Sequence, residues 1–180
     1  MTDEPAAWDA DTALEQLYAA HWRSLVRLAV LVVGDLAQAE EITQDAFVAV
    51  HARWRRLRDP DKALAYLRQT VVNRSRSALR HRAVVDRHAR ATGPTEASTT
   101  ALPGSDEAAV AAERRSRVLA ALQSLPDRQR EVMALRYYAG LSEAEIADAL
   151  GISRGAVKSH ASRGAASLRA TLTDYLEDRS

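Results

Sequence analysis

Apolar residues recur at helical spacing along most of the chain. They fall three or four positions apart from Leu14 to Val32, again from Ala39 to Trp54, and again from Leu64 to Leu79. This spacing puts apolar side chains on one face of a helix, and no bounded apolar–polar alternation competes with it. We therefore predict an all-α fold. The polar, acidic residues 1–13 lack the pattern, and we predict a disordered N-terminal segment there.

Turn signals divide the first part of the chain into three helices. Gly34 stops the first helix, and Asp35 can cap the second, with Gln38 at the capping-box position. Pro60 suits the first turn of the third helix. Three helices joined by short turns predict a small bundle over residues 14–88.

A linker and a second helical domain are predicted after this bundle. Residues 89–105 are rich in Thr, Ser, Gly and Pro and have no apolar period, which is typical of a linker. A flexible chain of ~15 residues spans roughly 20–25 Å. The domain over residues 106–175 begins with a helix whose expected apolar face is Val110, Val118, Leu119 and Leu122, and a further helix is expected over residues 129–138.

Residues 141–160 have the pattern of helix, tight turn and helix. Ser142 and Glu145 have capping-box spacing, Gly151 suits a left-handed helix end, and Ser153 can cap the next helix. The polar and basic second helix favours a DNA-binding helix-turn-helix over two helices that merely pack. The candidate DNA-binding residues are Ser153, Arg154, Val157, Lys158, Ser159, His160 and Arg163.

The net charge of +1 conceals a strong asymmetry. Residues 1–50 carry a net charge of −7, residues 51–90 carry +9, and residues 91–180 carry −1. The basic block suggests a polyanionic partner, although a solvated basic face would look the same. The chain has no cysteine, which excludes disulfides and fits a reducing cytoplasm. No apolar stretch approaches the ~20 residues that a membrane span needs.

No pattern of catalytic residues is evident. The seven glycines are isolated, so there is no phosphate-cradling loop, and none of the five histidines forms an i, i+4 pair with another. No serine stands in a nucleophile-elbow context. We expect no enzymatic activity, no metal site and no cofactor.

Two motif blocks carry a family resemblance. The first consists of residues 39–50 (AEEITQDAFVAV) and 65–73 (AYLRQTVVN). The second consists of residues 125–133 (LPDRQREVM), followed by Glu-Ile-Ala at 145–147 and Val-Lys-Ser at 157–159. Together they resemble regions 2 and 4 of the extracytoplasmic-function (ECF) group of bacterial sigma-70 factors, most closely the SigE-like subgroup.

The resemblance implies a function and partners. It implies a cytoplasmic, non-catalytic subunit that binds core RNA polymerase, directs it to −35/−10 promoters and promotes DNA melting. It also implies an anti-sigma factor as a partner. The helix-turn-helix would read the −35 element, and the linker would run through the polymerase channels.

The resemblance also assigns residues to surfaces. The polymerase's clamp helices, in its largest subunit, would contact the second helix, and the flap region is a further expected contact. The implied polymerase-binding residues are Glu41, Gln44, Asp45, Val48 and Arg53. The implied −10 element residues are Arg58, Asp61, Lys62, Tyr66, Gln69, Asn73, Arg74, Arg76 and Arg80.

Two other functions fit the pattern of helices. A dimeric helix-turn-helix regulator would bind palindromic half-sites without polymerase. A structural adaptor would not depend on the basic helix for DNA association. The separate basic helix of the N-terminal bundle favours the sigma factor.

Overall fold

The computed structural model describes residues 10–54, 62–89 and 106–177, and these ranges contain helices and turns but no strand. The predicted all-α fold is therefore confirmed. In chain order the elements are α1 (Ala10–Val33), α2 (Leu36–Arg53), α3 (Ala63–Ala89), α4 (Asp106–Gln123), α5 (Asp127–Met133), the π-helical turn η3 (Ala134–Tyr138), α6 (Glu143–Leu150) and α7 (Arg154–Glu177).

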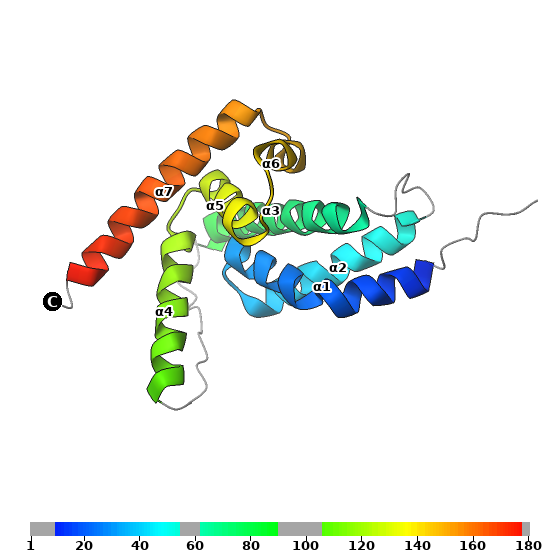
Figure 1. The fold of residues 1–180 in the computed structure, drawn as a ribbon, viewed down its shortest axis with the longest axis horizontal. Helices are drawn as coiled ribbons and strands as arrows, with labels where there is room; N and C mark the ends of the chain where they lie inside the picture. Colours follow the sequence, from blue (N-terminus) through cyan, green and yellow to red (C-terminus); the bar gives the residue numbers. More distant parts are fainter. Residues whose placement is uncertain (1–9, 55–61, 90–105, 178–180) are drawn as a thin grey trace, which may run out of the picture.

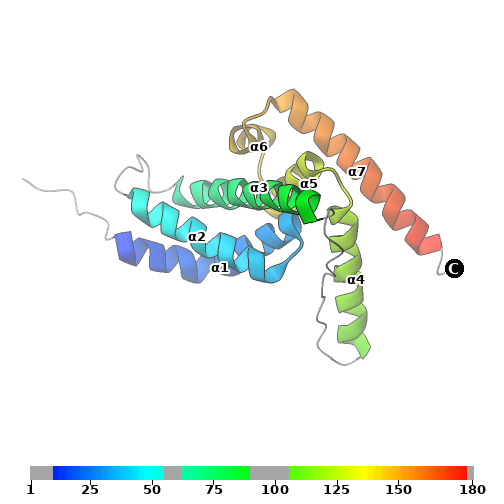
Figure 2. The same cartoon turned by 180° about the vertical axis from the view of Figure 1, so that it is seen from behind.

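Helices α1, α2 and α3 lie side by side as one bundle (Figures 1 and 2). The predicted apolar faces meet in its core, where Leu28, Val50 and Val71 are almost fully buried. Trp54 is also buried, so it serves the core. The start of the second helix is confirmed, because the Asp35 carboxylate accepts a hydrogen bond from the backbone N–H of Gln38 at 2.7 Å.

The first helix begins earlier than predicted. Residues 10–13, which the sequence placed in a disordered segment, form the first turn of α1. Ala13 is buried there, and Asp11 forms a 2.8 Å ion pair with His51 near the end of α2. These contacts involve a residue 40 positions away, so the local pattern does not reveal them.

Helix α4 projects from the body of the molecule, and only its C-terminal end packs (Figure 1). Leu122 is buried, whereas Val110 and Val118 are more than two-fifths exposed. The predicted helix forms, but these two valines of its apolar face remain exposed. Their spacing is helical, but among the described residues no partner helix covers this part of α4.

The fifth helix starts at Asp127 and widens into the π-helical turn η3, which the sequence did not predict. Helix α7 packs closely on α5 at Gly164. A Cβ atom at this position would lie 2.9 Å from Cγ of Met133. A side chain there would require the Met133 side chain or the helices to shift, so glycine allows the close approach of α7 to α5.

The helix-turn-helix forms as predicted from its caps. The backbone N–H of Glu145 donates to the Ser142 hydroxyl, and the Glu145 carboxylate accepts from the Ser142 backbone N–H, which completes a capping box. Gly151 ends α6 with φ of 63°, a left-handed conformation that favours glycine. α6 and α7 are therefore set by local chemistry.

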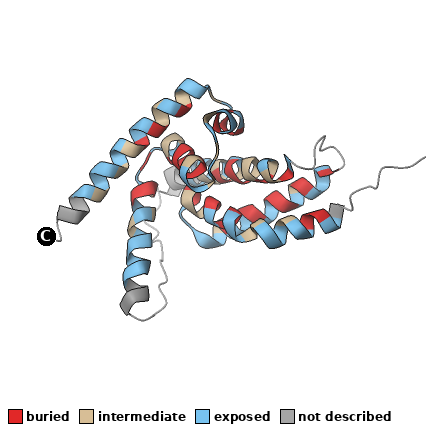
Figure 3. Ribbon diagram, in the orientation of Figure 1, coloured by how far each residue is buried: buried red, intermediate tan, exposed pale blue. Residues whose placement is uncertain are grey.

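The two predicted domains pack against each other. Val132 and Leu135 of the C-terminal part belong to the same buried cluster as Leu28 and Val72 of the N-terminal bundle. Buried residues run without a break from α1 into α5 and η3 (Figure 3). In the described ranges, no helix has both the length and the apolar character that crossing a membrane requires.

The cap of α6 gives a stability prediction. Replacing Ser142 by Ala removes the hydroxyl that accepts from Glu145, and we expect the free energy of unfolding to fall by about 1 kcal/mol. Urea denaturation followed by circular dichroism measures this. Ser142→Thr is the matched control, because it keeps a capping oxygen. Equal stability of the alanine and threonine variants would contradict the cap.

The same cap predicts a dependence on pH. The Ser142 hydroxyl, then the Ser142 backbone N–H, and to a smaller extent the charge of Arg68 hold the pKa of Glu145 below its ordinary value of 4.5. Ionised Glu145 therefore stabilises the fold above that value, and this contribution is lost as the pH falls through the lowered pKa. The stability difference between wild type and Ser142→Ala should narrow below pH 4.5. An unchanged difference would contradict this assignment.

Candidate nucleic-acid interface

The first turns of α7 present a basic face to solvent. Arg154, Lys158 and Arg163 are exposed, whereas Ser159 and His160 are half-buried. The Ser153 hydroxyl accepts from the backbone N–H of Ala156 at 3.1 Å, so it caps α7 as predicted. A capped helix N-terminus with outward cations has the geometry that major-groove recognition needs.

Val157 does not belong to this face. It was among the candidate DNA-binding residues, but its side chain is fully buried. It lies in the core cluster with Ile146 of α6, so it holds α7 in place and cannot reach a base. The helical period explains this difference, because residue 157 points inward when 154 and 158 point outward.

Glu143 of α6 partly neutralises the basic face. Its carboxylate lies 3.7 Å from the Lys158 ammonium and 3.3 Å from the Arg136 guanidinium. The Lys158 side chain remains two-thirds exposed, so this contact is weak in water. Lys158 can therefore exchange Glu143 for a phosphate at little cost.

The predicted −10 residues on α3 differ in accessibility. Lys62, Asn73 and Arg80 are exposed, and Tyr66 and Gln69 are half-buried. Tyr66 does not stand alone, because its hydroxyl accepts a 2.9 Å hydrogen bond from Arg53 at the end of α2. Arg58 and Asp61 lie outside the described residues.

Two arginines of α3 are engaged in ion pairs. Arg74 donates to the Asp45 carboxylate of α2 at 2.6 Å, which joins a predicted DNA-binding residue to a predicted polymerase-binding residue. Arg76 reaches out of the bundle and binds Glu131 of α5. Neither guanidinium is an unoccupied cation in this arrangement.

The outer face of α2 combines acidic and apolar groups. Glu41, Gln44 and Val48 are exposed, with Val48 at 63%. Beside them the ring of Tyr18 stacks on Trp22 at 4.7 Å and meets the ring of Phe47 edge-on. The predicted polymerase-binding residues thus border a partly exposed aromatic surface, which suits docking of another protein.

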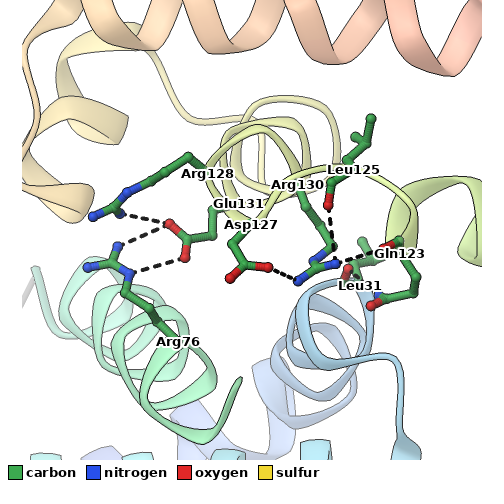
Figure 4. A network of polar contacts seen from close by, with 8 residues as sticks. All are labelled: Leu31, Arg76, Gln123, Leu125, Asp127, Arg128, Arg130 and Glu131. Atoms are coloured by element: carbon green, nitrogen blue, oxygen red, sulfur yellow. Dashed lines mark hydrogen bonds and ion pairs between the residues drawn. The ribbon is translucent and has the colours of Figure 1, made fainter. Parts of the chain in front are cut away.

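The contacts between the two halves were not predicted. Glu131 is buried between the guanidinium groups of Arg76 and Arg128, and the Gln123 side chain donates to the backbone carbonyl of Leu31 at 3.0 Å (Figure 4). The one local signal was a carboxylate at the start of an apolar run, because Glu131 directly precedes Val132. Its partner on α3 is 55 residues away.

Comparison with known families identifies the chain. Residues 17–84 match the model of sigma-70 region 2, and residues 115–168 match that of sigma-70 region 4. The chain is 34% identical over 171 residues to the ECF RNA polymerase sigma factor SigL of Mycobacterium tuberculosis, covering 92% of each protein. The chain belongs to the ECF group of the sigma-70 family. The predicted resemblance is thereby confirmed.

Other relatives agree with this assignment. This sigma factor is 33% identical over 151 residues to the RNA polymerase sigma-E factor of Streptomyces coelicolor, covering 83% of this chain and 80% of the relative. It spans only 41% of the length of another relative, the probable sigma factor RfaY of Xanthomonas campestris, at 29% identity.

A solved structure shares the fold. The sigma factor RpoE of Bartonella quintana, crystallised with the anti-sigma factor NepR, superposes with a TM-score of 0.71 at 22% identity. The match covers 88% of this chain and 96% of that one. The sequence matches and the shared fold favour a sigma factor over the dimeric regulator considered above.

The two roles assigned within α7 can be separated by mutation. Val157→Ala removes a fully buried side chain, and we expect it to lower the free energy of unfolding by about 2–3 kcal/mol. Arg154→Ala removes an exposed charge and should change stability by less than about 0.5 kcal/mol while weakening DNA binding. Urea denaturation and fluorescence anisotropy with promoter DNA measure the two effects. A stability loss in Arg154→Ala equal to that of Val157→Ala would contradict the assignment.

Proposed function

We propose that this sigma factor binds core RNA polymerase, directs it to promoters with −35 and −10 elements, and promotes DNA melting. The observation that carries the proposal is the pairing of two nucleic-acid surfaces in one chain. One is the exposed basic start of α7 on a Val157-anchored helix-turn-helix, and the other is the polar face of α3. They lie in the regions that match sigma-70 regions 4 and 2.

The −35 element would be read by α7. Arg154 and Lys158 extend from its first turns, where recognition helices contact base edges and phosphates. Arg163 lies farther along the helix and is better placed for the DNA backbone. Base contacts would set promoter preference, whereas phosphate contacts would set the register of the helix on the duplex.

The −10 element would be captured by α3. Asn73 and Arg80 are exposed on this helix, and Tyr66 and Gln69 are half-buried beside them. Unpaired bases bind to grooves that combine cations with aromatic or amide groups, because bases stack and phosphates are neutralised. We propose that binding of a separated strand on this face favours opening of the duplex.

The polymerase and a regulatory protein complete the proposed partners. Glu41, Gln44 and Val48 on the exposed face of α2 would meet the clamp helices of the largest subunit, and the C-terminal domain would meet the flap region. We also propose an anti-sigma partner. The related fold of RpoE is known in complex with the anti-sigma factor NepR.

A transcription assay tests the proposal. We expect run-off transcripts when the full chain, core polymerase and a cognate promoter are combined, and none when the chain is omitted. Permanganate footprinting should detect unpaired thymines near the −10 element. Asn73→Ala should reduce this reactivity, because the side chain lies on the proposed strand-binding face, while leaving the amount of polymerase complex unchanged.

Gel shifts with and without core polymerase separate the alternatives. A sigma factor should give promoter-specific binding mainly with core polymerase. Specific binding to palindromic sites by the chain alone, unchanged by polymerase, would contradict the proposal. Failure to bind core polymerase would do so as well.

A further inference from the structure

The buried carboxylate of Glu131 joins the two halves of the molecule. Its side chain is 1% exposed. Arg76 of α3 approaches it with two parallel hydrogen bonds, Nε to Oε1 and Nη2 to Oε2, each 3.1 Å long (Figure 4). Arg128, from the same helix as Glu131, donates to Oε2 at 2.8 Å. The bidentate geometry is the strong form of this interaction.

The pair covers one face of α3. Arg68, Val72 and Arg76 are four residues apart, so they line up on one side of the helix. Val72 is fully buried, Arg68 is half-buried, and the Arg76 side chain is only 19% exposed. This face therefore lies against the C-terminal domain.

The electrostatics of α6 support the same placement. Ser142 is the main reason that the pKa of Glu145 is lowered, but the positive charge of Arg68 contributes as well. A residue of α3 thus acts on a carboxylate of α6. The helix-turn-helix lies beside the bundle helix that is proposed to hold the −10 strand.

A second contact closes the interface at the end of α1. The Gln123 side chain donates to the Leu31 carbonyl, a group near the helix end that has no partner within the helix. Beside it, a Cβ on Gly34 would lie 3.0 Å from Cδ of Gln123. The close approach of the two domains extends from α3 to the end of α1.

We infer that the Arg76–Glu131 pair is a clasp that holds the C-terminal domain on α3 in the isolated chain and withholds Arg76 from nucleic acid. A carboxylate and a phosphate are alternative bidentate partners of one guanidinium, and Arg76 cannot bind both. Closure and strand binding at Arg76 then exclude each other. The second half of this inference rests on the proposed function of α3, whereas the clasp itself does not.

The clasp makes DNA affinity depend on opening. When only the open fraction of a protein can bind, the apparent dissociation constant rises in inverse proportion to that fraction. By linkage, DNA that binds Arg76 shifts the chain toward the open form. The factor of this shift equals the factor by which opening raises the affinity for DNA. Core polymerase that holds the two domains apart would have the same effect on Arg76.

Distance measurements between spin labels test the clasp without DNA or polymerase. The chain has no cysteine, so Ala19→Cys on α1 and Ala170→Cys on α7 create two unique and exposed labelling sites. We expect one narrow distance distribution for the labelled parent and a broad one after Arg76→Ala. Removal of Arg76 leaves the buried Glu131 carboxylate with Arg128 as its remaining cationic partner, and this partial loss of compensation disfavours the closed state.

Arg74→Ala is the matched control for this measurement. It removes the same residue type from the same helix, but the ion pair of Arg74 with Asp45 stays within the N-terminal bundle. We expect it to leave the distance unchanged. A broad distribution in the parent, or an Arg76→Ala variant with the parent's distance, would overturn the clasp.

Binding of a fluorescein-labelled single strand of mixed sequence tests whether Arg76 is withheld. Glu131→Gln keeps Arg76 but weakens its partner, and we expect at least about fivefold tighter binding, the lower end of typical coupling between two sites. Glu113→Gln removes the same charge from exposed α4 and is the control. Arg76→Ala combined with Glu131→Gln should bind no tighter than Arg76→Ala alone.

The outcomes separate the two halves of the inference. A broadened distance distribution in Arg76→Ala, with no gain in binding for Glu131→Gln over Glu113→Gln, would keep the clasp and overturn the withholding of Arg76. If Glu131→Gln loses its helical circular dichroism signal, Glu131→Asp replaces it, because aspartate keeps the charge and leaves Arg76 intact but is too short to preserve the two parallel hydrogen bonds. Glu131→Asp should then give the tighter binding, and equal or weaker binding would overturn the withholding. The transcription assay tests the proposed function separately.

Discussion

A single buried carboxylate constrains the arrangement of this molecule. Glu131 lies in the most buried part of α5, and its two oxygens are occupied by Arg76 and Arg128. A carboxylate in such a place is costly unless its hydrogen bonds are satisfied, so the position of α5 on the bundle depends on the position of α3. The continuous apolar cluster holds the two halves together, but apolar contacts are not directional and do not fix the orientation of one half on the other. The ion pair supplies the direction.

This arrangement gives the two proposed nucleic-acid surfaces different availability. The basic start of α7 is open to solvent, and its contact with Glu143 is weak. The face of α3 that carries Arg68, Val72 and Arg76 lies against the C-terminal domain. With the proposed roles, this closed form would present the −35 reader while it holds back part of the −10 surface. The order in which DNA is engaged could therefore be set within the chain.

The sequence predicted those features that depend on neighbouring residues. The caps at Asp35, Ser142 and Ser153 are local hydrogen bonds, so the spacing of residue types was enough to find them. The helical periods and the two family motifs were likewise readable. The family assignment needed only the order of the motifs, and it did not require knowledge of how the halves pack.

Features that depend on distant partners were not predicted. Val110 and Val118 have helical spacing but no covering helix, and Val157 has the motif position of a recognition residue but an inward direction. Arg76 looked like a DNA ligand because its acceptor lies 55 residues away. In each case the sequence pattern indicated a helix, but only the tertiary structure showed which residues of other elements lie against each of its faces.

The anchoring of α7 by Val157 has a consequence for how such proteins diverge. Because an inward valine and the close contact at Gly164 fix the helix, the outward residues contribute little to its stability. Exposed substitutions usually change folding free energy by only a few tenths of a kcal/mol. Substitutions at Arg154 and its neighbours could thus change promoter preference without destabilising the fold. Selection can then act on which promoters are recognised, independently of stability.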